Sequence, residues 1–217
     1  KELDEDANEN WSVTIGDLSE YSIMFGSELV ESGMGEIYLG GEIKRGSNFK
    51  TSIVINKIDS EGSVIWESEV SLGSENKFAG IVKAPDGGCV VAFLYSMLGY
   101  PFDKLGFQKI NADGTPDWFE EVDISEYSSI RDGNLVSDDN DILHFSGSVS
   151  GGASLYGGVL YVKFDAASSV FDQQFISVPD GRISCNKMFV ASDNSVLISG
   201  REEILSPSEK RPVVIRI

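Results

Sequence analysis

The chain has 217 residues and a formal net charge of −18, from 17 basic and 35 acidic side chains. A field of this sign repels phosphate backbones and anionic lipid surfaces, so binding to nucleic acid or to a charged membrane is disfavoured. No apolar run reaches the roughly 18 residues of a membrane-spanning helix, and a hydrophobic content of 41% is that of an ordinary globular domain.

The chain opens with an acidic, polar stretch, KELDEDANEN. This stretch would suit a tether after a processed export signal, so we expect an extracytoplasmic protein of the periplasm or cell surface, with a lipid anchor as one form of attachment. Asp4, Asp6 and Asn8 give the D-x-D-x-N opening of a calcium loop. Glu9 stands where that loop requires glycine and Ile15 where it requires glutamate, so no metal site is expected.

Beyond this stretch the chain consists of short apolar runs rich in Val, Ile, Phe and Tyr and bounded by Gly, Asn, Asp and Ser, which predict β-strands. Four runs recur in each of four repeats. The first runs cover residues 28–31, 79–84, 133–137 and 187–191, and the second runs cover 36–41, 89–94, 142–147 and 196–200. The third runs cover 52–58, 105–110, 159–164 and 212–217, and the fourth cover 64–70, 117–124, 170–178 and, displaced to the front, 11–15. No stretch keeps a helical period, so little helix is expected.

A frame of a basic residue, an apolar residue and Asp or Asn marks each repeat. It reads Lys57-Ile58-Asp59, Lys109-Ile110-Asn111, Lys163-Phe164-Asp165 and finally Arg216-Ile217. Successive frames begin 52, 54 and 53 residues apart, at positions 57, 109, 163 and 216. A period of about 53 residues along the whole chain is the signature of a repeat architecture.

The three tryptophans follow the same period. Trp11, Trp66 and Trp118 each lie seven residues after an Asp or Asn, at positions 4, 59 and 111. Four antiparallel strands per repeat predict an all-β protein, a β-propeller of four four-stranded blades, with repeats at about 27–77, 78–129, 130–183 and 184–217 plus 11–16. The last repeat lacks a fourth strand. We expect the N-terminal strand with Trp11 to supply it, which would close the ring and remove an exposed sheet edge.

The frame Lys-Ile-Asp-x-x-Gly-x-x-x-Trp at 57–66 resembles the repeats of bacterial propellers related to pyrroloquinoline-quinone-dependent dehydrogenases. It resembles still more closely the propeller repeats of bacterial surface lipoproteins and secreted proteins. The resemblance covers nearly the whole chain, and it implies that the repeat residues are structural, for turns and for packing between blades: Trp11, Trp66, Trp118, Asp59, Gly62 and Asp165. A quinone-dependent enzyme would also need a calcium site, and no convincing ligand set is present, so no cofactor is expected.

The side chains most suited to catalysis have structural explanations. Asp138, Asp139 and Asp141 cluster in a turn between two strands, where we expect them to be solvated. The single histidine, His144, lies within a strand and is expected to be packed or on the surface. Cys89 and Cys185 would lie on opposite blades, so we expect two free thiols, with Cys89 buried. The sequence therefore predicts no catalytic residue.

The most suitable residues for a ligand are on the longer loops at one end of the blades. Aromatic and acidic side chains around a concave mouth would suit a glycan or a peptide. The candidate ligand-binding residues are Tyr21, Tyr127, Glu20, Glu126, Phe49, Tyr100, Phe102 and Tyr156. The alternative is that Tyr21 and Tyr127 cap the blades and pack between them.

Two functions remain open on this reading. The first is a non-enzymatic binding or scaffold module of an exported bacterial protein, which binds a glycan or a protein partner on its loop-rich face. The alternative is a glycan-active hydrolase or lyase with carboxylates at the axial mouth, because propellers host such chemistry although the fold alone does not imply it.

Overall fold

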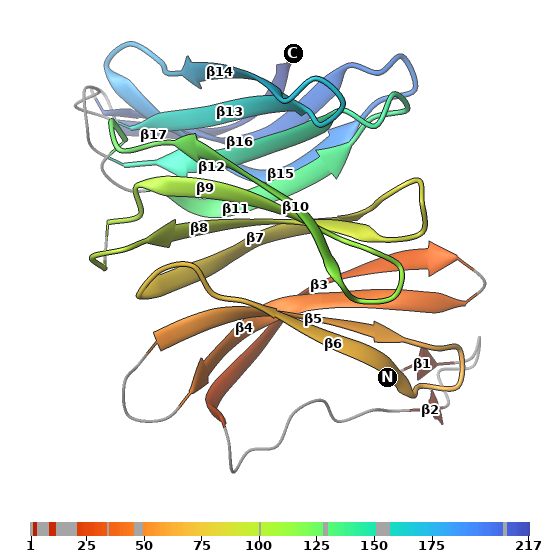
Figure 1. Cartoon of the computed structure of the whole chain (residues 1–217). Coiled ribbons are helices and arrows are strands. Elements are labelled where there is room, and N and C mark those ends of the chain that lie inside the picture. The colour runs from red at the N-terminus through yellow and green to blue at the C-terminus, as the bar shows by residue number, and fades with distance from the viewer. Residues whose placement is uncertain are drawn as a thin grey trace.

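The computed structural model describes residues 2–3, 9–11, 21–33, 35–45, 50–99, 101–127, 130–150, 157–205 and 208–217. The elements in these ranges are β-strands, which form four successive antiparallel sheets and a short N-terminal hairpin (Figure 1). The all-β class and the four sheets expected from the repeat are confirmed. The described part of the chain contains no helix that could span a membrane.

Each sheet is a meander whose strands are neighbours in chain order. The first contains β3 (Tyr21–Gly33), β4 (Glu36–Arg45), β5 (Lys50–Ile58) and β6 (Val64–Val70). The second contains β7 (Glu75–Lys83), β8 (Cys89–Ser96), β9 (Lys104–Ile110) and β10 (Pro116–Asp123). The third contains β11 (Ile130–Ser137), β12 (Leu143–Val149), β13 (Gly158–Asp165) and β14 (Val170–Ile176). The fourth contains β15 (Gly181–Val190), β16 (Val196–Leu205) and β17 (Ser208–Arg216).

The expected closure by the N-terminal strand is wrong for the residues that the structure describes. Strand β2 (Glu9–Trp11) pairs with β1 (Glu2–Leu3), and this hairpin lies far from β17 (Figure 1). The fourth sheet has three strands. Two segments that are close in the chain pair at a small cost in loop entropy, and the exposed Lys210 and Arg211 protect the edge of β17 by charge. A ring closed at four blades is therefore not established.

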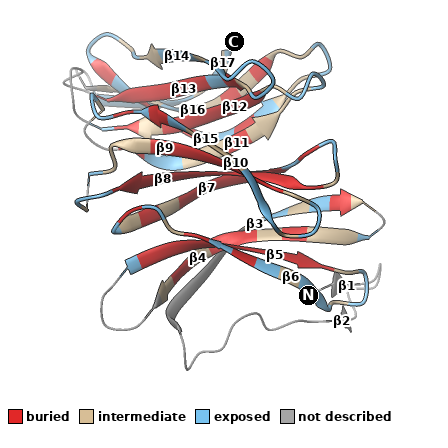
Figure 2. Cartoon of the chain, viewed as in Figure 1, coloured by how far each residue is buried: buried red, intermediate tan, exposed pale blue. Residues whose placement is uncertain are grey.

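The burial pattern explains why the middle strands are so apolar. All eight residues of β8 are buried, and β9 is buried from Leu105 to Ile110, because both faces of these strands are covered by neighbouring blades (Figure 2). The outermost strand β6 is mostly exposed at its start and buried at Ser68 and Val70. This gradient from centre to edge is that of blades stacked face to face.

The turn between the last two strands of a blade is stabilised by the aspartate and glycine that the sequence assigns to it. Asp59 Oδ1 accepts hydrogen bonds from the amides of Glu61 (3.0 Å) and Ser63 (2.7 Å), and Gly62 has a φ of 87°. In the third blade Asp165 Oδ1 accepts from the amide of Ala167 at 2.9 Å. These residues therefore shape turns.

Each of the four innermost strands carries a β-bulge, a feature that the sequence did not reveal. The bulges lie between Gly26 and Glu28, Phe78 and Gly80, Arg131 and Asn134, and Cys185 and Lys187. The second member of each pair lies 52, 54 and 53 residues after the one before it, at positions 28, 80, 134 and 187. The bulge therefore belongs to the repeat, and it redirects side chains at the same level of every blade.

Trp66 docks the first blade on the second. Its Nε1 donates to the carbonyl oxygen of Ala112 at 2.9 Å, and a Cβ added at Gly114 would meet the indole at 2.8 Å. Among the described residues none accepts from Trp118 Nε1, although Trp118 packs edge-on against Phe164 with ring centroids 5.7 Å apart. The two tryptophans thus share a position in the repeat and differ in their hydrogen bonding.

We expect Trp66→Phe to lower the free energy of unfolding by about 1 kcal/mol more than Trp118→Phe, because only Trp66 donates a hydrogen bond across the junction. Urea unfolding of both variants, followed by circular dichroism, measures the difference. Equal losses in the two variants would show that the Trp66–Ala112 hydrogen bond contributes nothing to docking.

Candidate functional site

The four bulges surround a pocket of about 250 Å³ on the axis where the inner strands meet. Residues from β3, β7, β11 and β15 all contribute to its wall, which is more polar than the packing between the blades. The lining residues are Glu28, Lys77, Phe78, Ala79, Asp132, Gly133, Asn134, Asn186 and Lys187. A single small space therefore receives carboxylate, ammonium, amide and aromatic groups from all four sheets.

Glu28 is the carboxylate of this axial pocket that accepts hydrogen bonds through both of its oxygens. Its Oε2 accepts from the backbone amide of Ile81 at 3.1 Å, and its Oε1 accepts from Lys187 Nζ at 3.2 Å. Its side chain is 25% exposed, whereas that of Lys187 is 65% exposed. Glu28 thus joins the first blade to the second and the fourth, and its carboxylate is fixed in orientation while still reaching solvent.

Asp132 is the second carboxylate of the pocket and lies within the bulge of β11. It has a φ of 54°, a conformation that short polar residues adopt more readily than others. Its carbonyl oxygen accepts from Asn134 Nδ2 at 3.1 Å and from Cys185 Sγ at 3.6 Å. The bulge is thereby tied to the fourth blade, and the exposed carboxylate of Asp132 is left at the mouth of the pocket.

A third carboxyl group stands behind the pocket wall. Glu42, on β4, accepts a hydrogen bond from the amide of Phe78 at 2.9 Å. Burial raises the pKa of Glu42, and this outweighs the opposing effects of that hydrogen bond and of Lys77 and Lys44. Glu42 does not line the pocket, so we regard it as a support for the Phe78 segment.

The loop residues predicted to bind a ligand are only partly described. Tyr127 is half-buried and stacks on Phe175, with centroids 5.7 Å apart and planes at 28°, and Phe102 packs on the same core cluster. Burial, aided by Glu126, raises the pKa of Tyr127 to about 12. The exposed Glu126 lies beside it. Outside the described residues lie Glu20, Phe49, Tyr100 and Tyr156, and also the side chain of Tyr21.

The expectation of a solvated aspartate turn in the third blade is wrong for Asp138. Its side chain is 8% exposed and lies 3.4 Å from His144 Nε2. Asp138 Oδ1 accepts from the amides of Asn140 (2.8 Å) and Ile142 (3.0 Å). Burial, the largest influence, raises the pKa of Asp138, but the hydrogen bonds from these amides and from His144 together outweigh it and lower the pKa. Asp139 and Asp141 are exposed, as expected.

His144 is buried, and its Nδ1 lies 2.7 Å from Tyr161 Oη. Burial lowers the pKa of His144, although Asp138 acts in the opposite direction, while burial raises the pKa of Tyr161 to about 12. The histidine, the tyrosine and the aspartate therefore form a closed structural network rather than a nucleophile and its base.

The two cysteines are free and Cys89 is buried, as expected, and Cys185 is buried as well. Burial raises the pKa of Cys89 to about 12. Within the described ranges, no three histidine, cysteine or carboxylate side chains converge in a way that could hold a metal ion. The axial pocket is the place, among the residues described, where the inner strands of all four sheets contribute side chains, including two carboxylates from different blades.

No protein-family model matches the chain, and no curated protein matches its sequence. Its fold is similar to that of a protein of unknown function from Dyadobacter fermentans DSM 18053, with a TM-score of 0.62, 11% identity, and coverage of 89% of this chain and 66% of that chain. The chain thus spans just under two thirds of that neighbour's length.

Two glycan-cleaving enzymes are also similar in fold. The endo-arabinase from Bacteroides thetaiotaomicron VPI-5482 has a TM-score of 0.51 and 15% identity, with 87% of this chain and 73% of that chain covered. A putative exo-β-1,3-galactanase from Bifidobacterium bifidum s17 has a TM-score of 0.54 and 11% identity, with 89% and 68% covered. At these identities the likeness shows the β-propeller fold alone.

The comparison overturns the expectation of a non-enzymatic binding or scaffold module, because the two neighbours of stated activity named above cleave glycans, which favours the alternative of a glycan-active hydrolase. Sequence reasoning missed Glu28 and Asp132 because they lie two repeats apart and form no local motif. The only feature of the sequence that could have pointed to these two residues is that polar residues interrupt the apolar strands at the bulge positions.

We expect His144 to make stability fall as the pH drops below about 6.5, its ordinary pKa. Because burial lowers the pKa of His144 in the folded chain, the unfolded chain takes up the proton first, so stability present above pH 6.5 is lost until the folded pKa is reached. The slope should not exceed about 1.4 kcal/mol per pH unit.

Urea unfolding of the wild type and of His144→Gln between pH 7 and pH 5 measures this effect. Since His144 is the only histidine, the difference between the two proteins isolates its contribution. Parallel stability profiles would show that the buried imidazole is not held in its neutral form.

Proposed function

We propose that the chain is a glycan-active hydrolase that cleaves a glycosidic bond in the axial pocket. The observation that carries the proposal is the meeting of Glu28 and Asp132 in one small pocket, on strands from different blades. Glycoside hydrolysis by a carboxyl pair needs one group to protonate the leaving oxygen and another to attack or to activate water. The similar fold of glycoside hydrolases supports the same class of reaction.

The environments of the two carboxylates suggest their roles. Glu28 is oriented by the Ile81 amide and by Lys187, so it suits attack on the anomeric carbon or the activation of water. Asp132 is exposed at the mouth and suits protonation of the leaving oxygen. The glycosidic C–O bond breaks, the leaving oxygen takes the proton of Asp132, the hydroxyl of water ends on the anomeric carbon, and the other proton of water restores the acid form of Asp132.

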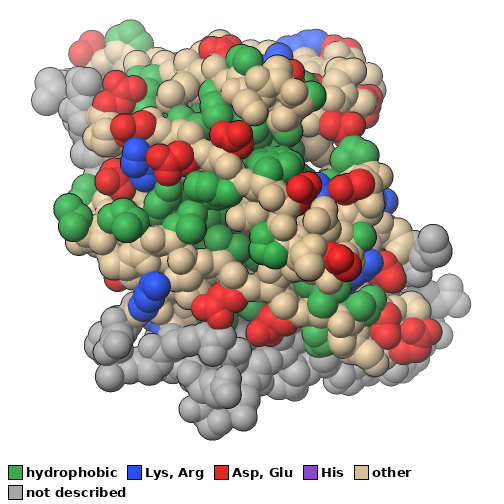
Figure 3. All heavy atoms as spheres, viewed as in Figure 1, with side chains coloured by type: hydrophobic (Ala, Val, Ile, Leu, Met, Phe, Trp, Pro, Cys, Tyr) green, Lys and Arg blue, Asp and Glu red, His purple; other side chains and the backbone are tan. Residues whose placement is uncertain are grey.

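The pocket wall favours an uncharged sugar. Two carboxylates are balanced by Lys77 and Lys187, while Asn134 and Asn186 offer amides that match sugar hydroxyls. Acidic side chains are spread over the visible face of the molecule with few basic ones among them (Figure 3), and the net charge is −18. Polyanionic glycans would be repelled on approach, so we propose a neutral glycan, such as an arabinan or a galactan, as the substrate class.

The loop residues enter the proposal as an outer binding region. Glycan chains longer than one unit would extend from the axial pocket toward the loops that carry Glu126, Tyr127 and Phe102, together with Tyr21, Glu20, Phe49, Tyr100 and Tyr156. Export to the periplasm or cell surface is proposed with this function, because polymeric glycans are met outside the cytoplasm.

The experiment incubates the chain with arabinan and with β-1,3-galactan and measures released reducing ends. We expect Glu28→Gln and Asp132→Asn each to lower turnover at least about 100-fold, as is typical for removal of an acid–base group. Glu31→Gln is the matched control, because Glu31 is an exposed carboxylate on the same strand.

Aryl glycosides with a good leaving group separate the two roles. Asp132→Asn should retain most of its activity on them, since their leaving oxygen needs no proton, whereas Glu28→Gln should stay inactive. Folded wild-type protein that releases no sugar from any neutral glycan, or unchanged turnover in both variants, would disprove the proposed function.

A further inference from the structure

A phenol ring fills the junction between the first two blades. The side chain of Tyr38 is fully buried, and its ring centroid lies 5.7 Å from that of Trp66. Its hydroxyl donates to the carbonyl oxygen of Gly87 in the second blade, and Lys57 Nζ lies 5.8 Å from the ring centroid. An indole, an ammonium group and a turn carbonyl thus hold this ring.

The next junction repeats the framework around a shorter residue. Tyr38 pairs with Lys57, the lysine of the repeat frame, across β4 and β5. In the second blade the matching lysine, Lys109, pairs with Val90 across β8 and β9. Val90 therefore holds the place of Tyr38.

The partners of the ring correspond as well. Trp118 holds the place of Trp66 in the repeat. Asp141 holds the place of Gly87, since the amides of Asp141 (3.0 Å) and Gly87 (3.1 Å) close the same turn, and their φ values are 61° and 83°. The second junction thus keeps the indole, the lysine and the turn, and lacks only the ring.

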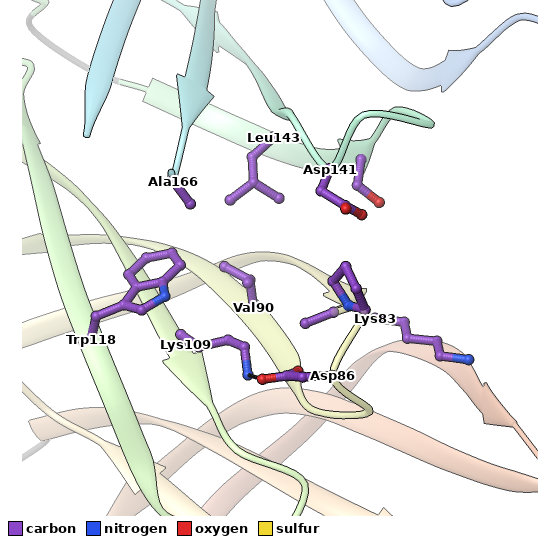
Figure 4. A pocket seen from close by; sticks show the side chains of 11 residues that line it. Lys83, Asp86, Val90, Lys109, Trp118, Asp141, Leu143 and Ala166 are labelled. Atoms are coloured by element: carbon purple, nitrogen blue, oxygen red, sulfur yellow. Dashed lines mark hydrogen bonds and ion pairs between the residues drawn. The ribbon is translucent and has the colours of Figure 1, made fainter. Parts of the chain in front are cut away.

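A pocket of about 260 Å³ occupies the position of the missing ring (Figure 4). The labelled side chains that surround it include Trp118, Val90, Leu143, Ala166 and Lys109. An apolar cavity of about 150 Å³ is enough to hold benzene, so this pocket has room for a substituted ring.

Two polar groups in the pocket are already in place. Lys109 is 5% exposed and is held by Asp86 at 2.8 Å, so its ammonium group is fixed where the counterpart Lys57 meets Tyr38. Trp118 Nε1 has no acceptor among the residues that the structure describes, whereas Trp66 Nε1 donates to Ala112.

In the third blade the position equivalent to Tyr38 and Val90 is filled by a ring, that of His144. His144 pairs with Lys163 of the repeat frame and therefore holds the same position, where it is buried and bonded to Tyr161. Of the three residues that pair with a frame lysine, Val90 is the shortest and carries no polar group.

We propose that the pocket between the second and third blades binds a para-hydroxyphenyl ring, presented by a small phenol or by a tyrosine side chain. The ring lies against Trp118 and Val90, its hydroxyl donates to the carbonyl oxygen of Asp141, and the Lys109 ammonium group contributes a cation–π interaction. No residue lines both this pocket and the axial pocket, so the phenol site does not depend on the hydrolase activity.

Titration of the intact chain with p-cresol, followed by tryptophan fluorescence and by calorimetry, tests the site. We expect a dissociation constant on the order of 1 mM, as befits a ligand of this size. Toluene should bind roughly tenfold more weakly, because it cannot make the hydrogen bond to Asp141. N-acetyl-tyrosinamide is the second ligand: its binding assigns the site to a tyrosine side chain, and binding of p-cresol alone assigns it to a small phenol.

Val90→Tyr places the proposed ring in the pocket covalently, so we expect a folded variant with a higher Tm that no longer binds p-cresol. Ala166→Leu, on an exposed turn, should block the pocket without altering the strands. Three results would overturn the proposal: no p-cresol binding to the wild type at about 50 mM, equal affinity for toluene, or binding that survives in whichever of the two variants folds.

Discussion

The structure depends on how closely successive blades pack along their inner strands. A Cβ added at Gly133 would lie 2.6 Å from the Cβ of Ala79, and one added at Gly80 would lie 2.6 Å from the Cβ of Leu135. At this distance no side chain separates the backbones of β7 and β11, so the inner strands meet at the axis and their middle neighbours are buried on both faces. The bulges of β7 and β11 lie at this close approach, and Phe78 and Asn134 at these bulges line the axial pocket.

One repeated framework thus supports several different environments. At the same bulge the blades offer Glu28, Gly80, Asn134 and Lys187, and the positions that pair with a frame lysine hold Tyr38, Val90 and His144. The backbone repeats every 52 to 54 residues, but the side chains at equivalent positions differ from blade to blade. An approximately symmetric scaffold therefore carries pockets whose lining is different in each blade. The axial pocket is polar because charged side chains such as Glu28 and Lys187 stand at the bulges. The junction pocket is open because Val90 stands where the first blade has Tyr38.

The strands themselves could be predicted well from the sequence. Val64–Val70 has the bounds expected from its apolar run, and Cys89–Ser96 extends the expected 89–94 by two residues. The inner strands were predicted too short: Tyr21–Gly33 was expected only at 28–31, and Gly181–Val190 only at 187–191. The bulge breaks the alternation of apolar and polar residues in these strands, so the pattern was visible only on one side of it.

The sequence by itself determined the all-β class, the repeat of about 53 residues, the turn role of Asp59 and Gly62, and two free cysteines of which Cys89 is buried, because each of these rests on local or periodic chemistry. Only the tertiary structure decided that Trp11 pairs with Glu2 rather than with the last sheet, that Asp138 is buried against His144, and that Glu28 and Asp132 line the same axial pocket. The first outcome depends on pairing between nearby segments in place of closure with the distant last sheet, the second on how a turn packs against the strand that follows it, and the third on which distant strands come together. A periodic sequence predicts the same neighbours for every repeat, and the physical differences between blades appear only where unlike side chains face one another across a junction.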